Sequence, residues 1–204
     1  MLVGIVDYGL GNVKSVKSAF EYLGHDAILC QEDTDFQKVS HIVLPGVGAF
    51  ERGMELINKK KLKNILHSQV LIQRKQTLGI CLGLQLMAQS SCEFGHHTGL
   101  SWFPGEVVEL PQVQGRIELP NIGWESIEVK KDALFEGISN HSDFYFIHSF
   151  HLKLSDKKYC LATYEIGKEK IVAAIKKDNI IATQFHPEKS QENGLKLMEN
   201  FLKM

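Results

Sequence analysis

A cysteine between two glycines, and a histidine followed by a carboxylate, supply the residue types of covalent acyl chemistry. Cys81 lies between Gly79 and Gly83, after a short apolar run, and His186 and Glu188 lie near the end of the chain. A thiol nucleophile, a base and a carboxylate that orients the base make up a catalytic triad. A glycine-flanked turn from strand to helix would expose the thiol, and the dipole of the following helix would favour its thiolate form.

Each of these features also has a purely structural interpretation. A cysteine after a buried strand is most often a packed apolar residue, and His-Pro-Glu also occurs in ordinary turns. The two glycines around Cys81, taken together with the distant pair His186 and Glu188, favour the catalytic interpretation.

The first ninety residues alternate between apolar segments and turns, which predicts a parallel sheet with helices on both faces. Strands are expected at residues 2–6, 27–30, 41–44 and 76–80, and helices at 13–23 and 54–73. Because α/β sheets bind ligands at the carboxyl ends of their strands, the turns at 7–12, 45–48 and 79–83 are the candidate site. The turn at 45–48 is equally consistent with half of an oxyanion hole and with a tight turn.

The second half of the chain has a different pattern. Short β segments separated by turn residues predict antiparallel strands added to one side of the core. They are expected at residues 107–110, 126–129, 144–150, 159–163, 171–175 and 180–185, followed by a helix at 194–202. No repeat, low-complexity segment or linker interrupts this pattern, so residues 1–204 are expected to form one domain.

Composition argues against several functional classes. The 204 residues carry a formal net charge of −1 at pH 7, which gives no overall electrostatic attraction to nucleic acid. No apolar run is long enough to span a bilayer, and the first residues predict a strand, not a signal peptide. The four cysteines form neither CxxC pairs nor a dense disulfide framework, which predicts a reducing, cytoplasmic location. No metal is expected, because the adjacent His96 and His97 lack supporting carboxylates.

Residues 79–85 and 184–190 together resemble the class I (triad) glutamine amidotransferases. Residues 7–12, 44–50 and 145–150 narrow the resemblance to the HisH group, the glutaminase subunits of imidazole glycerol phosphate synthase, over essentially the whole chain. The resemblance implies an α/β, flavodoxin-like fold: a mostly parallel sheet with helices on both faces and antiparallel strands added in the C-terminal half. It implies no cofactor.

The resemblance also implies a role for each matching residue. Cys81 would be the nucleophile, His186 the general base and acid, and Glu188 the residue that orients the histidine. The backbone amides of Val47 and Leu82 would form the oxyanion hole. The residues expected to hold the substrate L-glutamine are Gly48, Gln85, Glu93, Ser149 and Phe150.

The implied reaction is hydrolysis of glutamine to glutamate and ammonia through a γ-glutamyl thioester on Cys81. In this group the ammonia passes through a channel to a (β/α)8-barrel synthase subunit of histidine biosynthesis. Because a free glutaminase would waste glutamine, the loop at 45–48 is expected to be misaligned until the partner binds, and activation would be a population shift.

One segment departs from the family pattern. The family commonly has Pro-His-Met-Gly-Trp-Asn where residues 120–125 are Pro-Asn-Ile-Gly-Trp-Glu. Asn121 and Trp124 are the expected partner-interface residues. The changes at Asn121 and Glu125 leave open a paralogous subunit that feeds ammonia to a barrel making amidino groups on surface-polysaccharide sugars.

Two further classes stay open at the level of sequence. One is a stand-alone γ-glutamyl cysteine hydrolase on the same scaffold, against which the sequence around His186 argues. The other is a non-catalytic subunit, against which the presence of all three triad residue types argues.

Overall fold

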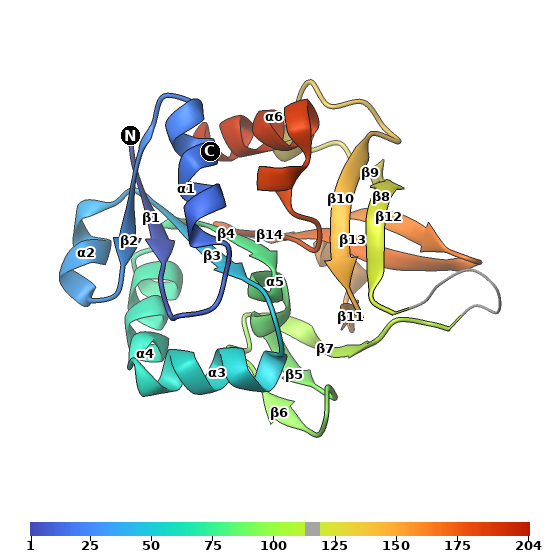
Figure 1. Cartoon of the computed structure of the whole chain (residues 1–204), viewed down its shortest axis with the longest axis horizontal. Helices are drawn as coiled ribbons and strands as arrows, with labels where there is room; N and C mark the ends of the chain where they lie inside the picture. Colours follow the sequence, from blue (N-terminus) through green and yellow to red (C-terminus); the bar gives the residue numbers. More distant parts are fainter. Residues whose placement is uncertain (113–118) are drawn as a thin grey trace.

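The computed structural model describes residues 1–112 and 119–204 and is built on an eight-stranded sheet (Figure 1). The strand order is β2-β1-β3-β4-β14-β13-β12-β9, and the first five strands are parallel. These five are β2 (Asp26–Cys30), β1 (Leu2–Val6), β3 (His41–Gly46), β4 (Gln76–Cys81) and β14 (Ile180–Thr183). The antiparallel strands are β13 (Glu169–Lys177), β12 (Cys160–Ile166) and β9 (Glu128–Val129). The predicted mixed α/β architecture is confirmed. The expectation that the strand at 180–185 joins the sheet only by antiparallel pairing is wrong, because β14 is antiparallel to β13 on one side but lies parallel beside β4 on the other.

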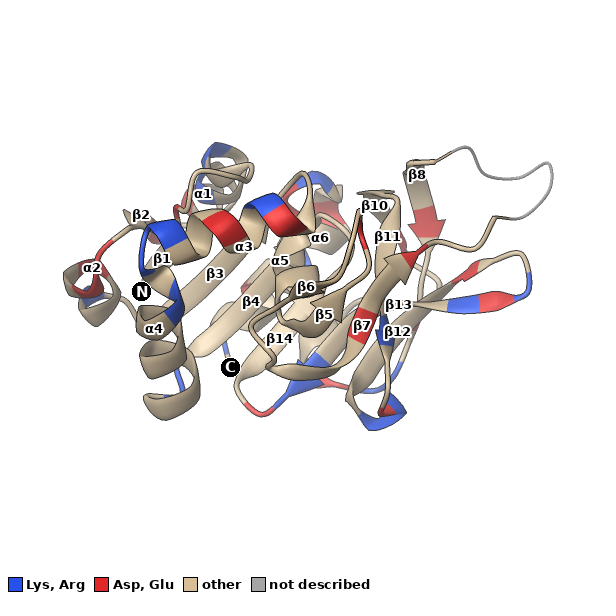
Figure 2. Cartoon of the chain, turned by 90° about the horizontal axis from the view of Figure 1, so that it is seen from below, with Lys and Arg blue, Asp and Glu red and all other residues tan. Residues whose placement is uncertain are grey.

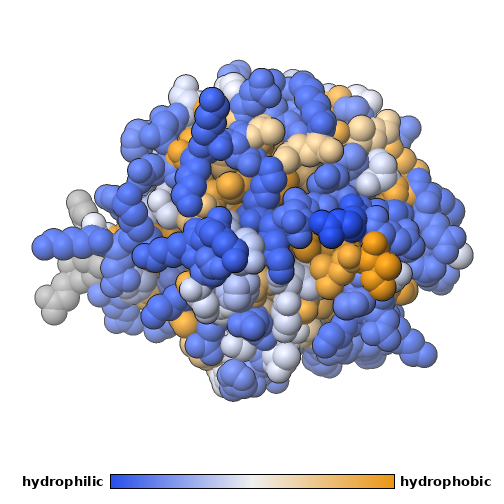
Figure 3. Space-filling model, turned by 180° about the vertical axis from the view of Figure 1, so that it is seen from behind, coloured by the Kyte–Doolittle hydropathy of each residue, from blue (hydrophilic) through white to orange (hydrophobic). Residues whose placement is uncertain are grey.

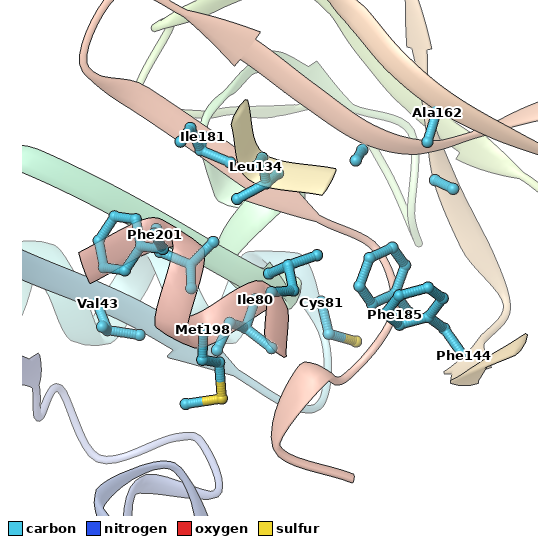
Figure 4. Packing of buried hydrophobic residues seen from close by; sticks show 14 of the residues in the cluster. Val43, Ile80, Cys81, Leu134, Phe144, Ala162, Ile181, Phe185, Met198 and Phe201 are labelled. Carbon is cyan, nitrogen blue, oxygen red and sulfur yellow. The ribbon is translucent and has the colours of Figure 1, made fainter. Parts of the chain in front are cut away.

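Helices cover both faces of the parallel strands (Figure 1). On one face lie α1 (Val13–Tyr22) and α6 (Gln191–Leu202), and on the other lie α2 (Asp33–Lys38), α3 (Phe50–Lys59) and α4 (Leu62–Leu66). Because side chains alternate along a strand, Val3 and Ile5 of β1 enter the core under α1 and α6, while Val6 enters the core under α3 and α4. Figure 4 shows Met198 and Phe201 of α6 in the first of these cores, which extends to Cys81.

Two smaller sheets complete the described part of the chain. One has the order β11-β7-β5-β6 and the other pairs β10 with β8. Their strands are β5 (Ala88–Ser91), β6 (His97–Thr98), β7 (Phe103–Glu109), β8 (Asn121–Ser126), β10 (Asp143–His148) and β11 (Phe150–Leu154). The short helical turns are α5 (Leu82–Leu86), η1 (His67–Ile72), η2 (Ala133–Phe135), η3 (Lys157–Tyr159) and η4 (Pro187–Lys189).

The single helix expected at residues 54–73 is interrupted. Lys61 has a φ of 58°, in the left-handed region, and separates α3 from α4. A π-helical turn, η1, then ends the segment at Ile72. Hydrophobic spacing continues across the break, since Leu62 and Leu66 pack into the same core as Ile57, and the sequence pattern therefore did not reveal the interruption.

The strand expected at residues 144–150 is two strands that belong to different sheets. β10 ends at His148 and pairs with β8, whereas β11 begins at Phe150 and pairs with β7. The expected strand at 126–129 is divided in the same way at the buried Ile127. Neither α2 nor β5 was predicted, because both are short and carry few apolar residues.

The turn after β4 requires a glycine at position 83. A Cβ placed on Gly83 would lie 1.8 Å from the backbone oxygen of Leu44, a contact that only backbone movement could relieve. Gly79 is also crowded, since its Cβ would lie 2.8 Å from Cε of Met87. The two glycines around Cys81 therefore allow β3, β4 and α5 to approach one another closely.

We expect Gly83→Ala to lower the free energy of unfolding by roughly 3 kcal/mol or more, because the added methyl overlaps a backbone carbonyl. Urea unfolding followed by circular dichroism measures the change. Gly53→Ala is the matched control: its Cβ would meet only side-chain atoms, the nearest being the flexible end of Leu86 at 3.0 Å. A Gly83→Ala protein as stable as the Gly53→Ala control would contradict the close packing described for this turn.

The surface carries charges of both signs. Acidic and basic residues alternate along α3 (Figure 2), and on the face shown in Figure 3 hydrophilic side chains surround separate hydrophobic areas. Across residues 1–112 and 119–204, no helix has the length and apolar composition needed to span a membrane.

Candidate active site

Cys81 ends β4 and adopts a backbone conformation that is rare for a side-chain-bearing residue. Its φ is 54° and its ψ is −108°, a strained combination of the kind that concentrates at functional sites. The predicted turn from strand to helix is present, but α5 has only five residues before β5 begins at Ala88. The predicted contribution of the helix dipole is therefore small, and other groups beside the sulfur are needed to stabilise a thiolate.

Two groups lie within hydrogen-bonding distance of the sulfur. Sγ of Cys81 is 3.7 Å from the carbonyl oxygen of Ile147 and 3.8 Å from Nε2 of Gln184. The carbonyl can only accept a hydrogen bond and the amide nitrogen can only donate one. The thiol form therefore donates to Ile147, and the amide of Gln184 donates to the sulfur.

His186 and Glu188 form a buried pair. Nδ1 of His186 lies 2.8 Å from Oε1 of Glu188, and both side chains are 1% exposed. The backbone at His186 is held on both sides, because its N–H donates to Tyr145 and its carbonyl accepts from the hydroxyl of Ser190. The orientation of the imidazole is thus fixed by both its side chain and its backbone.

The electrostatics of this pair favour a charged imidazole. Burial alone lowers the pKa of His186, but the influence of the nearby Cys81 sulfur and Glu188 carboxylate outweighs it and raises the pKa to about 10. Nδ1 is occupied by Glu188, and Nε2 has no hydrogen-bond partner within the described ranges. The free nitrogen is therefore the one available to Cys81, and the arrangement suits a thiolate–imidazolium pair.

The loop predicted to supply half of an oxyanion hole lies beside the cysteine. In the β3–β4 register Gly46 is opposite Cys81, so Val47 follows one residue beyond. The hydroxyl of Tyr8 donates a hydrogen bond of 2.9 Å to the Pro45 carbonyl and anchors the start of the loop. Gly48 has a φ of 96°. The roles of the Val47 and Leu82 amides stay predictions.

The residues predicted to bind substrate are only partly brought together by direct contacts. Gln85 is buried, and its Nε2 donates to the backbone oxygen of Phe150 at 2.8 Å. Ser149 directly precedes Phe150 at the break between β10 and β11. Oε2 of Glu93 instead accepts from the backbone N–H of Phe50 at 2.7 Å, and so holds the helix that follows the 45–48 loop. Substrate binding by these residues stays a prediction.

The two predicted interface residues differ in exposure. Trp124 is 46% exposed, and its ring centroid lies 5.9 Å from that of Tyr145 on the paired strand. Asn121 is 8% exposed and lies opposite His148 in the β8–β10 register. Ile122, at 57% exposure, was not predicted but adds to the apolar surface beside Trp124.

Gln184 was given no role from the sequence, although it belongs to the motif that contains His186. Gln184 and His186 are two residues apart directly after a strand, a spacing that places extended side chains on the same side. This spacing was the signal that could have placed both beside Cys81. The described residues hold no group of three or more His, Cys, Asp or Glu side chains arranged to bind a metal ion.

Buried histidines make the fold sensitive to acid. Burial lowers the pKa of His148 to about 4, whereas an unfolded histidine titrates near 6.5. Between these values the unfolded chain binds more protons than the folded one, so stability falls as the pH drops through this window. The asparagine variant His148→Asn keeps an N–H but does not titrate.

We expect His148→Asn to reduce the loss of unfolding free energy between pH 7.5 and pH 4.5 by roughly 2 kcal/mol. Urea unfolding at the two pH values measures the difference, and His67→Asn, at an exposed histidine, is the control. If the wild type, His148→Asn and His67→Asn lost the same unfolding free energy on acidification, the low pKa assigned to His148 would be contradicted.

The chain is similar to known proteins over nearly its whole length. The family model described as glutamine amidotransferase class-I matches residues 4–204. The chain is 43% identical over 204 residues to imidazole glycerol phosphate synthase subunit HisH 1 of Campylobacter jejuni, covering all of both chains. It is 40% identical to subunit HisH of Caldanaerobacter subterraneus, covering 100% of this chain and 98% of the relative.

A solved structure supports the fold at lower sequence identity. A chain of PurLQS from Thermotoga maritima superposes with a TM-score of 0.73 at 16% identity, covering 99% of this chain and 97% of the other. The match over residues 4–204 and the identity to full-length HisH subunits lead to one assignment. The chain belongs to the class-I glutamine amidotransferase family of enzymes, and within it to the HisH group.

Proposed function

We propose that this chain is the glutaminase subunit of an imidazole glycerol phosphate synthase. It hydrolyses L-glutamine to glutamate and ammonia and passes the ammonia to a HisF-like (β/α)8-barrel subunit in histidine biosynthesis. The observation that carries the proposal is the buried contact of 2.8 Å between Nδ1 of His186 and Oε1 of Glu188, with the other imidazole nitrogen left for Cys81. The HisH names of the full-length relatives support the pathway.

The first half-reaction forms a thioester. The Cys81 thiolate attacks the carboxamide carbon of glutamine, and the negative charge moves to the carboxamide oxygen, which the amides of Val47 and Leu82 stabilise. The carbon–nitrogen bond then breaks, and the imidazolium of His186 gives its Nε2 proton to the departing nitrogen, which leaves as ammonia. Glu188 stabilises the imidazolium before this transfer and holds the ring in place.

The second half-reaction releases glutamate. Neutral His186 takes a proton from water at Nε2, and the resulting hydroxide attacks the thioester carbonyl. The carbon–sulfur bond breaks, and the sulfur leaves as the thiolate beside the imidazolium. The enzyme thereby returns to its starting charge state, so the same two residues serve as acid and base in turn.

Glutamine would be held beside Cys81 by Gln85, Ser149, Phe150, Gly48 and Glu93. The Nε2 atom of Gln85 is already engaged by Phe150. Its side-chain oxygen is therefore the atom left to accept a hydrogen bond from the ammonium group of glutamine.

The barrel partner would bind the exposed face of β8. Ile122 and Trp124 expose apolar surface there, next to Tyr145 and the lysine at position 189, whose Nζ lies 5.6 Å from the Tyr145 ring. An aromatic residue at the centre of such a surface is typical of a binding hot spot. Asn121 is largely buried, so it would support this surface from the layer beneath the exposed side chains.

A second acceptor is supported by the departures from the family pattern in the same strand. Asn121 and Glu125 stand where the family commonly has histidine and asparagine. The alternative destination of the ammonia is therefore a barrel that makes amidino groups on surface-polysaccharide sugars, ranked behind the histidine-pathway barrel.

Ammonia release from glutamine, measured with and without the purified histidine-pathway barrel subunit, tests the proposal. We expect little release by the chain alone and at least tenfold more with the barrel. No stimulation by the histidine-pathway barrel, together with stimulation by an amidino-sugar barrel, would transfer the proposal to the second acceptor. Cleavage of γ-glutamyl peptides without any partner would overturn both.

We expect Trp124→Ala to weaken binding of the barrel subunit by about 30-fold, because a buried hot-spot aromatic contributes about 2 kcal/mol. Titration calorimetry with the barrel measures the dissociation constant. The control is Tyr22→Ala, at an aromatic that is 79% exposed on α1. Equal binding by the two variants would contradict the placement of the interface.

We also propose that residues 1–204 form one domain in the cytoplasm. The two helical layers share one sheet, which supports a single domain. None of the four cysteines is in a disulfide, which supports a reducing compartment.

A further inference from the structure

A buried glutamine amide contacts the sulfur of the catalytic cysteine. Gln184 is fully buried, and its Nε2 lies 3.8 Å from Sγ of Cys81. Its backbone N–H donates to the carbonyl of Ala173 at 2.8 Å, which holds the residue against β13. A sulfur that becomes a thiolate needs hydrogen-bond donors in such a dry environment. Gln184 supplies one in addition to His186.

The neighbours of Gln184 determine which end of its amide faces the sulfur. Gln85 lies between Gln184 and the backbone oxygen of Phe150, which can only accept. The NH₂ group of Gln85 must therefore point to this carbonyl, at 2.8 Å, and it also donates to Oε1 of Gln184, at 3.3 Å. With its oxygen engaged in this way, Gln184 presents its own NH₂ group to Cys81.

His148 also contacts the backbone carbonyl of Phe150, and Tyr164 holds His148 in place. Nδ1 of His148 lies 2.8 Å from the oxygen of Phe150 and must donate to it, so Nε2 is an acceptor. The hydroxyl of Tyr164, 2.9 Å away, donates to that Nε2. Burial lowers the pKa of His148 to about 4, so the ring is neutral near pH 7 and keeps this tautomer. Burial also raises the pKa of Tyr164, which keeps its proton in place.

We propose that Gln184 is a catalytic residue that donates a hydrogen bond to the Cys81 thiolate, and that Gln85, His148 and Tyr164 are positioning residues that fix its amide. The chain of contacts runs from Tyr164 through His148, the Phe150 carbonyl and Gln85 to Gln184, and each step has one allowed direction of donation. When the thiolate attacks, the sulfur loses its charge, and the amide returns to a weak neutral contact. This inference rests on the proposed glutaminase function of Cys81.

Alkylation of Cys81 by iodoacetamide tests this role without glutamine turnover. The rate is measured on the isolated full chain from pH 6 to pH 10, with peptide mass spectrometry to select the label on Cys81. We expect Gln184→Leu to lower the rate at pH 7 by roughly tenfold, the value of one charge-assisted hydrogen bond, and to recover the wild-type rate at high pH. Tyr164→Phe should lower it by about threefold, since it removes only the last donor of the chain.

Tyr159→Phe is the matched control, because Tyr159 is a partly buried tyrosine that packs edge-on against Phe103, outside this chain of contacts. It should leave the profile unchanged. The alkylation rate of Gln184→Glu is measured as well. This variant keeps the size of the side chain and the oxygen that accepts from Gln85. It should lower the alkylation rate at pH 7 at least as much as Gln184→Leu. Thermal unfolding confirms that each variant is folded.

Three results would overturn the inference. The first is a wild-type pH profile of Cys81 alkylation in a folded Gln184 variant. The second is an alkylation rate that a Gln184 variant lowers equally at every pH. The third is an effect of Tyr159→Phe on the alkylation rate as large as that of Tyr164→Phe. A wild-type chain that alkylates as expected but releases no ammonia with a barrel partner would instead refute the proposed function. The two failures are therefore distinguishable.

Discussion

Cys81→Ala is expected to abolish ammonia release from glutamine by the chain assembled with its barrel subunit, a loss of at least about 10⁴-fold. Without the thiol no thioester forms, and the remaining groups can only assist the direct attack of water. Colorimetric detection of glutamate and ammonia over a long incubation measures the residual rate.

The control for this variant is a second cysteine in a similar environment. Cys160 is buried, and its Sγ donates to the carbonyl of Ala162, so Cys160→Ala removes a thiol of similar burial outside the site. It should retain near wild-type activity. Substantial activity in the Cys81→Ala complex would mean that the catalytic role assigned to this residue is wrong.

Glu188→Gln is expected to lower the rate of glutamine hydrolysis by about 10³-fold. The side chain keeps its size, but a neutral amide cannot stabilise the imidazolium of His186 by charge. Its NH₂ group can also donate to Nδ1, which moves the imidazole proton to Nε2 and leaves no base facing Cys81. Steady-state kinetics of the assembled complex should show the loss in kcat, with little change in KM.

A charge-neutralising change elsewhere separates this effect from a general loss of charge. Glu199 lies on α6, where it pairs with the lysines at positions 196 and 203 on the surface. Glu199→Gln should leave kcat unchanged. If Glu188→Gln retained more than about a tenth of the wild-type kcat, an orienting carboxylate would not be required, and the triad would reduce to Cys81 and His186.

The sequence predicted those parts of the fold that follow from local patterning. The parallel strands β1 to β4 were expected because each is a short apolar segment that ends in a turn, and the glycines at 79 and 83 indicated the sharp turn at Cys81. The break at Lys61 could not be predicted, because it depends on one backbone dihedral and leaves the apolar spacing unchanged. The division at Ser149 was hidden for the same reason: both halves of the segment carry strand-like residues, and only their partners differ.

The site was predictable at the level of residue types but not of contacts. His186 and Glu188 are two residues apart in the sequence, so their pairing required only a local turn. The contact between Gln184 and Cys81 joins residues 103 positions apart, and it depends on β14 lying beside β4 in the sheet. The inward position of Asn121 likewise follows from its register opposite His148, which no local pattern specifies.

The thioester on Cys81 is the covalent bond on which the proposed chemistry depends, and mass spectrometry can observe that bond directly. The chain, assembled with its barrel subunit, is mixed with glutamine, quenched in acid during steady-state turnover and digested at low pH. We predict that a γ-glutamyl group is attached to the peptide containing Cys81, and that it is absent when His186 is replaced by alanine. Continued ammonia release with no label on Cys81, or with the label on Cys30, Cys92 or Cys160 instead, would contradict the proposed mechanism.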